Sequence, residues 1–286
     1  MEVLGERLGV GANAEVYAYG PGKVIKLFFD RGRANGIEWE YRRTLAVWQL
    51  GLPVPQPFGI VEIGERPGLV LECIDGPSLA ESLFAHGDTG ALLSMARLLH
   101  RVHSVVPEQA RATGLKSPKA ELAWKTYNSG ELTGAEKRAI AHRLADLPDG
   151  QQVCHGDFHM LNVLMRGGEP VLIDWQGAFL GEAGLDVMWM LMILRYAVVP
   201  EGMLPQSLID AFYASRHDFE RAFFEEYNRL TGVTMEQVEA WFLPCAVNRL
   251  CSDLLPAEHD AVLAEIRRRC AASAADAPMV GVSDLP

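Results

Sequence analysis

The order of apolar and polar positions along the chain predicts strands first and helices afterwards. Up to about residue 71, short apolar runs alternate with Gly and Pro turns, apart from the segment 35–50, whose apolar residues recur at helical spacing. After Gly76 most segments have helical spacing, and capping boxes that begin at Thr133 and Thr234 predict two helix starts. We therefore expect an α+β fold.

Two short apolar runs in the middle of the chain predict a hairpin. The runs Val163–Met165 and Val171–Ile173 flank a turn that contains two consecutive glycines. A hairpin brings the residue before its first strand close to the residue after its second strand. Asn162 and Asp174 should therefore lie together at the open end.

These polar residues suit phosphoryl transfer. Asp157 lies shortly before Asn162, in a loop behind another apolar run, so a second carboxylate should lie near the same point. Magnesium prefers such hard oxygen donors. Phosphoryl transfer needs an Asp that accepts the proton of the attacking hydroxyl, which fits Asp157, and an Asn and an Asp that hold metal ions, which fit Asn162 and Asp174. The alternative, that all three are ordinary turn residues, is disfavoured by their joint spacing.

The motifs around these residues resemble a known family. HGDFHMLN followed by IDW is similar to the catalytic and metal-binding loops of the aminoglycoside phosphotransferase and choline kinase family, which resembles the protein kinases in fold. The resemblance implies a two-lobe, protein-kinase-like fold with ATP or GTP and Mg²⁺ in the cleft. The implied parts are a nucleotide-binding lobe (1–74) and a catalytic and substrate-binding lobe (75–271). The end of the chain (272–286) consists mostly of small residues, contains Pro and has little periodicity, so we expect a flexible tail there. Met160 replaces the usual Pro of the loop, which makes the loop less stiff.

The N-terminal segment has the pattern of a nucleotide-binding hairpin. Gly9 and Gly11 are expected in a turn before the run Val16–Tyr19, as in the Gly-rich tip that covers nucleotide phosphates in kinases. The run VIKLFF then forms a third strand, which places Lys26 at the spacing of the phosphate-binding lysine. The alternative for Lys26 is an exposed strand lysine.

Further nucleotide contacts are implied by the resemblance. The family has a Glu on the first helix that pairs with the strand Lys, and Glu40 sits at the matching distance before LPVP. Glu38 points to a different helix face, so we choose Glu40; the alternative is a solvated helix carboxylate. After the strand predicted at Leu69–Ile74, the carbonyl of Glu72 and the amide of Ile74 should hydrogen-bond the adenine edge.

Composition narrows the class of protein. The formal net charge of -11 and the pI of about 5.2 argue against a nucleic-acid partner. Five cysteines without CxxC or metal-finger spacing favour reduced thiols in the cytoplasm. The most apolar stretch, Val187–Val199, is interrupted by Arg195, so we expect a buried helix and no membrane span.

Outside the central motifs, Asp186 matches a family residue that ties the catalytic loop from the start of a helix. The alternative is that Asp186 is simply an acid in the first turn of a helix, where the helix dipole favours a negative charge. His100 and His103 should be packing or surface residues without a metal-ligand partner nearby. His155 and His159, which flank the catalytic Asp, should brace the loop rather than take protons.

The predicted reaction is transfer of the γ-phosphoryl group of ATP or GTP to a hydroxyl of a small molecule. HGD rather than HRD, and IDW rather than DFG, argue against a protein substrate. The resemblance favours a cationic, aminoglycoside-like acceptor, and acids of the helical half could line its side of the cleft. These acids are Glu182, Asp186, Asp218, Glu220, Glu225, Glu226, Asp253, Glu258 and Asp260. The alternatives are a solvated acidic surface, a kinase of choline, homoserine or a sugar, and a nucleotide-binding pseudokinase.

Overall fold

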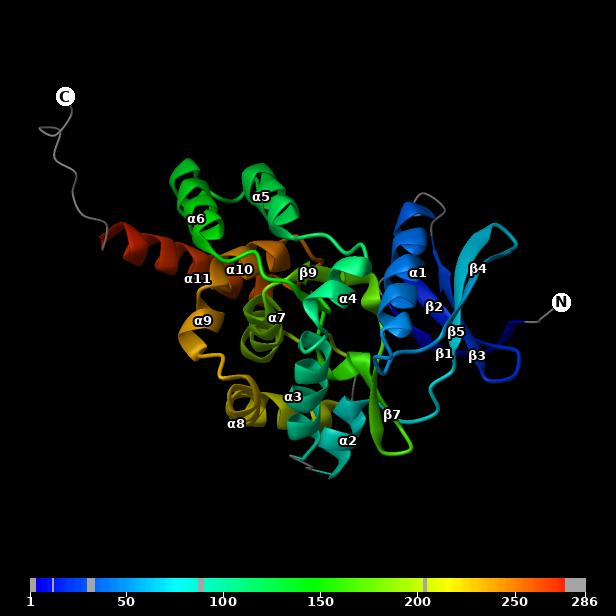
Figure 1. The fold of residues 1–286 in the computed structure, drawn as a ribbon. Helices are drawn as coiled ribbons and strands as arrows, with labels where there is room; N and C mark the ends of the chain where they lie inside the picture. Colours follow the sequence, from blue (N-terminus) through cyan, green and yellow to red (C-terminus); the bar gives the residue numbers. More distant parts are fainter. Residues whose placement is uncertain (1–3, 12, 30–33, 87–89, 203–204, 276–286) are drawn as a thin grey trace, which may run out of the picture.

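The N-terminal lobe is built on one antiparallel sheet. The computed structural model describes residues 4–11, 13–29, 34–86, 90–202 and 205–275. The strands of the sheet are β1 (Leu4–Val10), β2 (Ala14–Tyr19), β3 (Lys23–Phe28), β4 (Pro57–Ile63) and β5 (Arg66–Glu72). They lie in the order β1-β2-β3-β5-β4 (Figure 1). A strand-rich first lobe before a helical second lobe confirms the predicted kinase-like α+β fold.

Helix α1 (Ala34–Gln49) covers one face of this sheet, close to the helix predicted over 35–50. Successive strand side chains point to opposite faces, so Phe28 of β3 packs with Ile37 of α1 while Ile25 lies in the cluster on the other face. Lys26 shares the face of Phe28. Strand alternation therefore directs Lys26 toward α1.

The second lobe is mainly helical. Its helices are α2 (Leu79–His86), α3 (Gly90–His103), α4 (Pro107–Ala112), α5 (Lys119–Asn128), α6 (Gly134–Asp146), α7 (Ala183–Tyr196), α8 (Gln206–Thr231), α9 (Met235–Glu239), α10 (Phe242–Leu250) and α11 (Pro256–Ala275). Helix α7 lies in the middle of the lobe, between α5 and α6 on one side and α3 and α8 on the other (Figure 1). Its residues from Ala183 to Met192 are all buried, as predicted for the apolar stretch. Within the described ranges, every helix lacks the combination of length and apolar character needed to cross a bilayer.

Two short antiparallel pairs lie in the helical lobe. Strands β7 (Val163–Arg166) and β8 (Glu169–Leu172) form the predicted hairpin, with Val163 opposite Leu172. Strands β6 (Gln152–Cys154) and β9 (Phe179–Gly181) form the second pair. The loop that carries Asp157 follows β6 directly.

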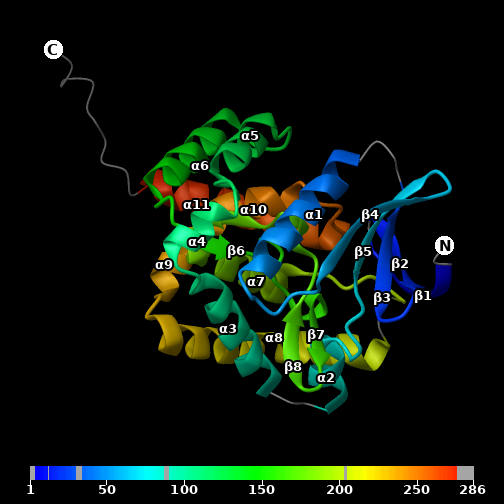
Figure 2. The same cartoon turned by 45° about the vertical axis from the view of Figure 1, so that its right-hand side comes forward.

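The link between the lobes is held against the hairpin. The amide of Met165 donates to the carbonyl of Pro77 at 2.9 Å. A Cβ on Gly76 would lie 1.9 Å from the carbonyl oxygen of Met165, so only glycine permits this approach. Figure 2 shows α1 between the sheet and the helical lobe, so both lobes border the region around the hairpin.

Helix ends agree with the capping chemistry of the sequence. Thr133 and Thr234 cap α6 and α9 with complete capping boxes, as predicted. Helix α11 continues to Ala275, inside the segment 272–286 that we expected to be a tail. Its Ala-rich end consists of good helix formers. Residues 276–286 lie outside the described residues.

Candidate active site

The loop that carries Asp157 depends on close backbone packing. Gly156 has a φ of 79°, and a Cβ there would lie 2.2 Å from the carbonyl oxygen of Gly177. A glycine is therefore required where this loop crosses the segment after Asp174. The crossing brings the two loops of the HGD and IDW motifs together.

The carboxylate of Asp157 is held by neighbouring side chains and remains 40% exposed. Its Oδ1 accepts a hydrogen bond of 2.9 Å from the indole N–H of Trp189. Its Oδ2 lies 3.6 Å from His159 Nε2. Burial by itself raises the pKa of Asp157, but the nearby imidazole of His159 and the hydrogen bond from Trp189 outweigh it and hold the pKa well below its ordinary value. Asp157 is therefore a carboxylate at neutral pH and can accept a proton.

Asn162 and Asp174 meet at the open end of the hairpin, as predicted. The amide of Ile173 donates to the carbonyl of Asn162 at 2.8 Å, which continues the pairing of β7 and β8 by one step. The Nδ2 of Asn162 bonds the carbonyl of Asp157 at 2.9 Å and lies 3.0 Å from His159 Nε2. The Oδ1 of the Asn162 side chain is thus the atom that remains available to bind a cation.

Asp174 has a strained backbone. Among the described residues, Asp174 is the only non-glycine residue with a positive φ, which is 61°. The next residue, Trp175, is buried, and its indole N–H donates to the carbonyl of Leu172 at 2.9 Å, which anchors the turn. Asp tolerates this left-handed conformation better than most residues, and such strain is found at functional sites. One carboxylate and one amide oxygen form a donor set that fits Mg²⁺.

Lys26 joins the two lobes electrostatically. Its Nζ lies 2.9 and 3.1 Å from the carboxylate oxygens of Glu40 and 3.1 Å from Asp174 Oδ1. Burial alone lowers the pKa of Lys26, but the negative charges of Glu40 and Asp174 outweigh it, so the pKa is raised and the amine stays charged. Glu40 is buried, whereas Glu38 is exposed and pairs with Arg42 one turn along α1. The structure thus joins Lys26 to Glu40 and not to Glu38.

We expect Glu40→Gln to raise the KM for the Mg-nucleotide about tenfold, because a charge-assisted bond to Lys26 is lost. Glu38→Gln removes the same charge two residues away and should leave the KM at the wild-type value. Steady-state kinetics with the nucleotide varied would measure both. A larger effect of Glu38→Gln than of Glu40→Gln would contradict the pairing.

The other predicted nucleotide residues lie at the edge of the sheet. Gly9 is not in the turn, as we expected, but in β1 opposite Val16; the turn begins at Gly11, whose amide donates to Ala14 O at 2.8 Å. The hairpin thus reaches two residues further than the glycine spacing suggested. The residue between Gly11 and Asn13 lies outside the described residues.

The adenine contacts were predicted at the end of β5. Strand β5 ends at Glu72, and the amide of Cys73 donates to Gly22 O at 2.9 Å. The side chain of Glu72 forms an ion pair of 2.9 Å with Arg166 of the hairpin, and Ile74 is buried. The hydrogen bonds between adenine and the carbonyl of Glu72 and the amide of Ile74 stay predictions.

Asp186 holds the backbone of the catalytic loop. Its carboxylate accepts from the amides of His155 at 2.6 Å and Gly156 at 2.8 Å. Burial raises the pKa of Asp186, but the hydrogen bond and charge of His103 outweigh it and lower the pKa. The family-derived expectation of a tie between Asp186 and this loop is therefore met.

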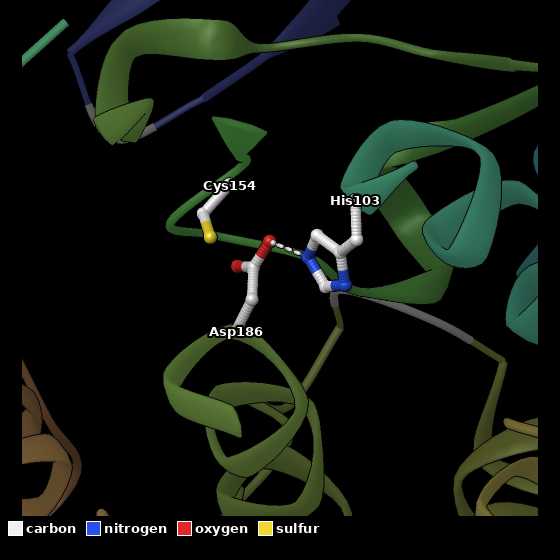
Figure 3. Close-up of side chains that lie close together, drawn as sticks. All are labelled: His103, Cys154 and Asp186. Carbon is white, nitrogen blue, oxygen red and sulfur yellow. Dashed lines mark hydrogen bonds and ion pairs between the residues drawn. The ribbon is translucent and has the colours of Figure 1, made fainter. Parts of the chain in front are cut away.

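For His103, the predicted packing position is confirmed and the alternative surface position is wrong. His103 is buried, and its Nε2 lies 3.1 Å from Asp186 Oδ2, beside Cys154 (Figure 3). The other ring nitrogen bonds the hydroxyl of Tyr227 at 2.6 Å. We expected no metal-ligand residue near His103, yet all three side chains of Figure 3 are of ligand type. The signal was present in the helical spacing, because His103 follows the buried Leu99 by one turn.

The cluster of Figure 3 is a hydrogen-bonded support rather than a metal centre. Both oxygens of Asp186 accept bonds from backbone amides, and both ring nitrogens of His103 have partners. Burial raises the pKa of Cys154 well above its ordinary value, so its thiol stays protonated and is a poor ligand. The network therefore fixes the catalytic loop against α3 and α8.

We expect Asp186→Asn to lower the free energy of unfolding by about 1 to 3 kcal/mol, because the Nδ2 that replaces one carboxylate oxygen cannot accept a hydrogen bond and leaves one buried backbone amide unpaired. Because folding lowers the pKa of Asp186, its contribution is present above the unfolded pKa of about 3.9 and is lost as the pH falls toward the folded pKa. Urea titrations at several pH values should show this acid dependence in the wild type and less of it in the variant. Identical curves would contradict the assignment.

A cavity of about 850 Å³ opens beside Asp157 and Asp174. The N-terminal lobe contributes Trp39 and Arg43 from α1, and the helical lobe contributes the start of α5, Trp189 of α7 and the end of α10.

The charge of this cavity is mixed. Its acids are Glu121, Asp157, Asp174, Asp186 and Asp253, and its bases are Arg43, Lys116, Lys125 and Arg249. Of the nine acids named from the sequence, only Asp186 and Asp253 are among the lining residues. Others are used elsewhere: Glu220 pairs with Arg195, and Glu258 with Arg249. Their partners come from other helices, which the sequence does not reveal.

Known proteins share this architecture. A sequence profile described as the phosphotransferase enzyme family matches residues 5–227. Among curated proteins, no match was found.

Solved structures with the same fold have low sequence identity. Choline kinase LicA from Streptococcus pneumoniae is 16% identical at a TM-score of 0.60, covering 94% of this chain and 93% of its own. The streptomycin-ATP ternary complex of APH(2")-IIa is 13% identical at a TM-score of 0.60, covering 93% and 91%. Aminoglycoside-3'-phosphotransferase of type VIII is 20% identical at a TM-score of 0.54, covering 84% and 91%. The fold is thus shared with aminoglycoside and choline kinases, and the profile match over most of the sequence shows that this chain belongs to the phosphotransferase enzyme family.

Proposed function

We propose that this protein transfers the γ-phosphoryl group of ATP or GTP to a hydroxyl of a small molecule. The observation that carries the proposal is the convergence of Lys26, Asp157, Asn162 and Asp174 beside one cavity. A pseudokinase would not need a proton-accepting carboxylate beside a cavity. In the proposed reaction, Asp157 takes the proton of the acceptor hydroxyl, whose oxygen forms a new bond to the γ-phosphorus. The bond from that phosphorus to the bridging oxygen breaks, and its electron pair leaves with the nucleoside diphosphate.

The remaining residues hold the nucleotide. Lys26, kept charged and oriented by Glu40, would bind the phosphates, and the Gly11 turn would cover them. Glu72 and Ile74 would present the backbone groups that meet adenine, and Gly9 supports the hairpin from within β1. Asn162 and Asp174 would hold Mg²⁺, which neutralises phosphate charge when bound.

We propose an aminoglycoside-like acceptor first, because one protein of the same fold is an aminoglycoside phosphotransferase and another forms a ternary complex with streptomycin and ATP. Glu121 and Asp253 offer carboxylates to its amines within the cavity. The second candidate is a small metabolite that carries an anionic group as well. It is favoured by the basic side chains Arg43 and Lys116 in the same lining, and choline kinase has the same fold.

An ADP- or GDP-release screen would test the function. The panel should contain aminoglycosides, amino alcohols, hydroxy amino acids and sugars, with Asp157→Asn as the inactive control. An acceptor that releases nucleoside diphosphate only with the wild type would support the proposal. Ionic strength then separates the two acceptor classes, because attraction of a polycation should weaken as the Debye length falls below about 8 Å. Wild-type release that depends on no acceptor and equals that of Asp157→Asn would contradict a phosphotransferase.

A further inference from the structure

Trp189 is the side chain beside the reacting carboxylate to which no sequence motif assigned a role. It is buried on α7, yet part of its surface lines the cavity. Its indole N–H donates to Asp157 Oδ1 at 2.9 Å. A buried tryptophan with a satisfied N–H is by itself ordinary core packing, so the partner decides its importance. Here the partner is the proposed proton acceptor.

Helix α7 contacts the catalytic loop twice from one face. Asp186 holds the backbone amides of His155 and Gly156, and Trp189 holds the side chain of Asp157. Residues three positions apart are neighbours on a helix surface. The same helical turn therefore sets both the position of the loop and the direction of its carboxylate.

The ring of Trp189 is itself held in place. The guanidinium of Arg249 lies 5.8 Å from the ring centroid, within the range of a cation–π contact. Arg249 is anchored in turn by Glu258, with Nε to Oε1 at 2.7 Å. The indole is thus fixed between α10 and the catalytic loop, so its N–H direction is set before an acceptor binds.

The two oxygens of Asp157 have different surroundings. Oδ1 takes the well-formed bond from Trp189, whereas Oδ2 has neighbours at 3.3 Å (Asn162 Nδ2) and 3.6 Å (His159 Nε2). Hydrogen bonds of such lengths are weak or absent. Oδ2 therefore keeps the lone pair that can receive a proton.

We infer that Trp189 is a positioning residue, which occupies Oδ1 of Asp157 and so presents Oδ2 to the hydroxyl of the acceptor. The inference rests on the proposed function.

The chain offers a matched control. Trp241 is also buried, and its indole N–H also donates to a carboxylate, that of Glu182, at 3.0 Å. Trp189→Phe and Trp241→Phe thus remove the same atom group and the same type of bond from one lobe. Only the first bond involves Asp157.

The test compares these two variants with the wild type. We expect Trp241→Phe to keep both the wild-type kcat and the wild-type KM for the nucleotide, because its indole bonds Glu182 and not Asp157. With the acceptor found by the screen, Trp189→Phe should lower kcat about tenfold and keep the KM for the nucleotide.

Folding defects are controlled separately. Benzothienylalanine at position 189 keeps the ring shape and replaces only the N–H by sulfur, so it should reproduce the effect of Trp189→Phe. A wild-type kcat in both replacements would overturn the inference, while loss of turnover in Asp157→Asn would leave the proposed function standing. Full turnover in Asp157→Asn would instead remove Asp157 from the mechanism, and the positioning role of Trp189 with it, whereas only nucleotide turnover that depends on no acceptor would contradict the proposed function.

Discussion

Asp157→Asn should lower turnover by about 10²- to 10⁴-fold, the range expected when a general base is removed. The substitution keeps an oxygen that can accept the bond from Trp189, so the loop should keep its shape. Asp186 binds the backbone of the neighbouring residues and is untouched. Nucleotide affinity should therefore stay near the wild-type value, which calorimetry would measure beside the steady-state rate.

A control for this variant is Asp218→Asn, at a carboxylate that is exposed and pairs only with Arg221 among the contacts of the described residues. It removes the same charge far from the cavity lining and should leave turnover unchanged. Equal rates in wild type and Asp157→Asn would remove Asp157 from the mechanism.

Asp174→Asn should weaken binding as well as chemistry. Asn adopts positive φ readily, so the strained turn should persist. What is lost is the carboxylate that faces Lys26 and would hold Mg²⁺. We expect the affinity for the Mg-nucleotide to fall about tenfold or more, and turnover to fall with it.

Calorimetry with and without Mg²⁺ separates the loss of a metal ligand from other causes of weaker nucleotide binding. The gain in nucleotide affinity that Mg²⁺ produces should be large in the wild type and small in Asp174→Asn. The same Mg²⁺-dependent gain in both proteins would show that Asp174 is not a metal ligand, even if turnover falls.

Local features of the fold were predictable because they depend on neighbours in the chain. The hairpin β7–β8 follows from two apolar runs around a glycine turn, and its closure places Asn162 beside Asp174. The family resemblance, together with the different helix faces of Glu38 and Glu40, selected Glu40 as the partner of Lys26, and the structure joins these two residues. The position of Gly9 was wrong, because glycine spacing alone does not show where a strand ends.

The sequence by itself determined the order of the two lobes, the central hairpin and the closeness of Asn162 and Asp174 at its open end, because strand, helix and turn preferences act over short separations. Only the tertiary structure decided which distant side chains support them. Trp189 bonds Asp157 across 32 positions, and His103 bonds Tyr227 across 124. Tertiary packing also decided the charge of the cavity, because acids such as Glu220 and Glu258 are paired by arginines that the fold brings beside them. Such contacts depend on how helices pack on one another, and no local pattern of residues records that arrangement.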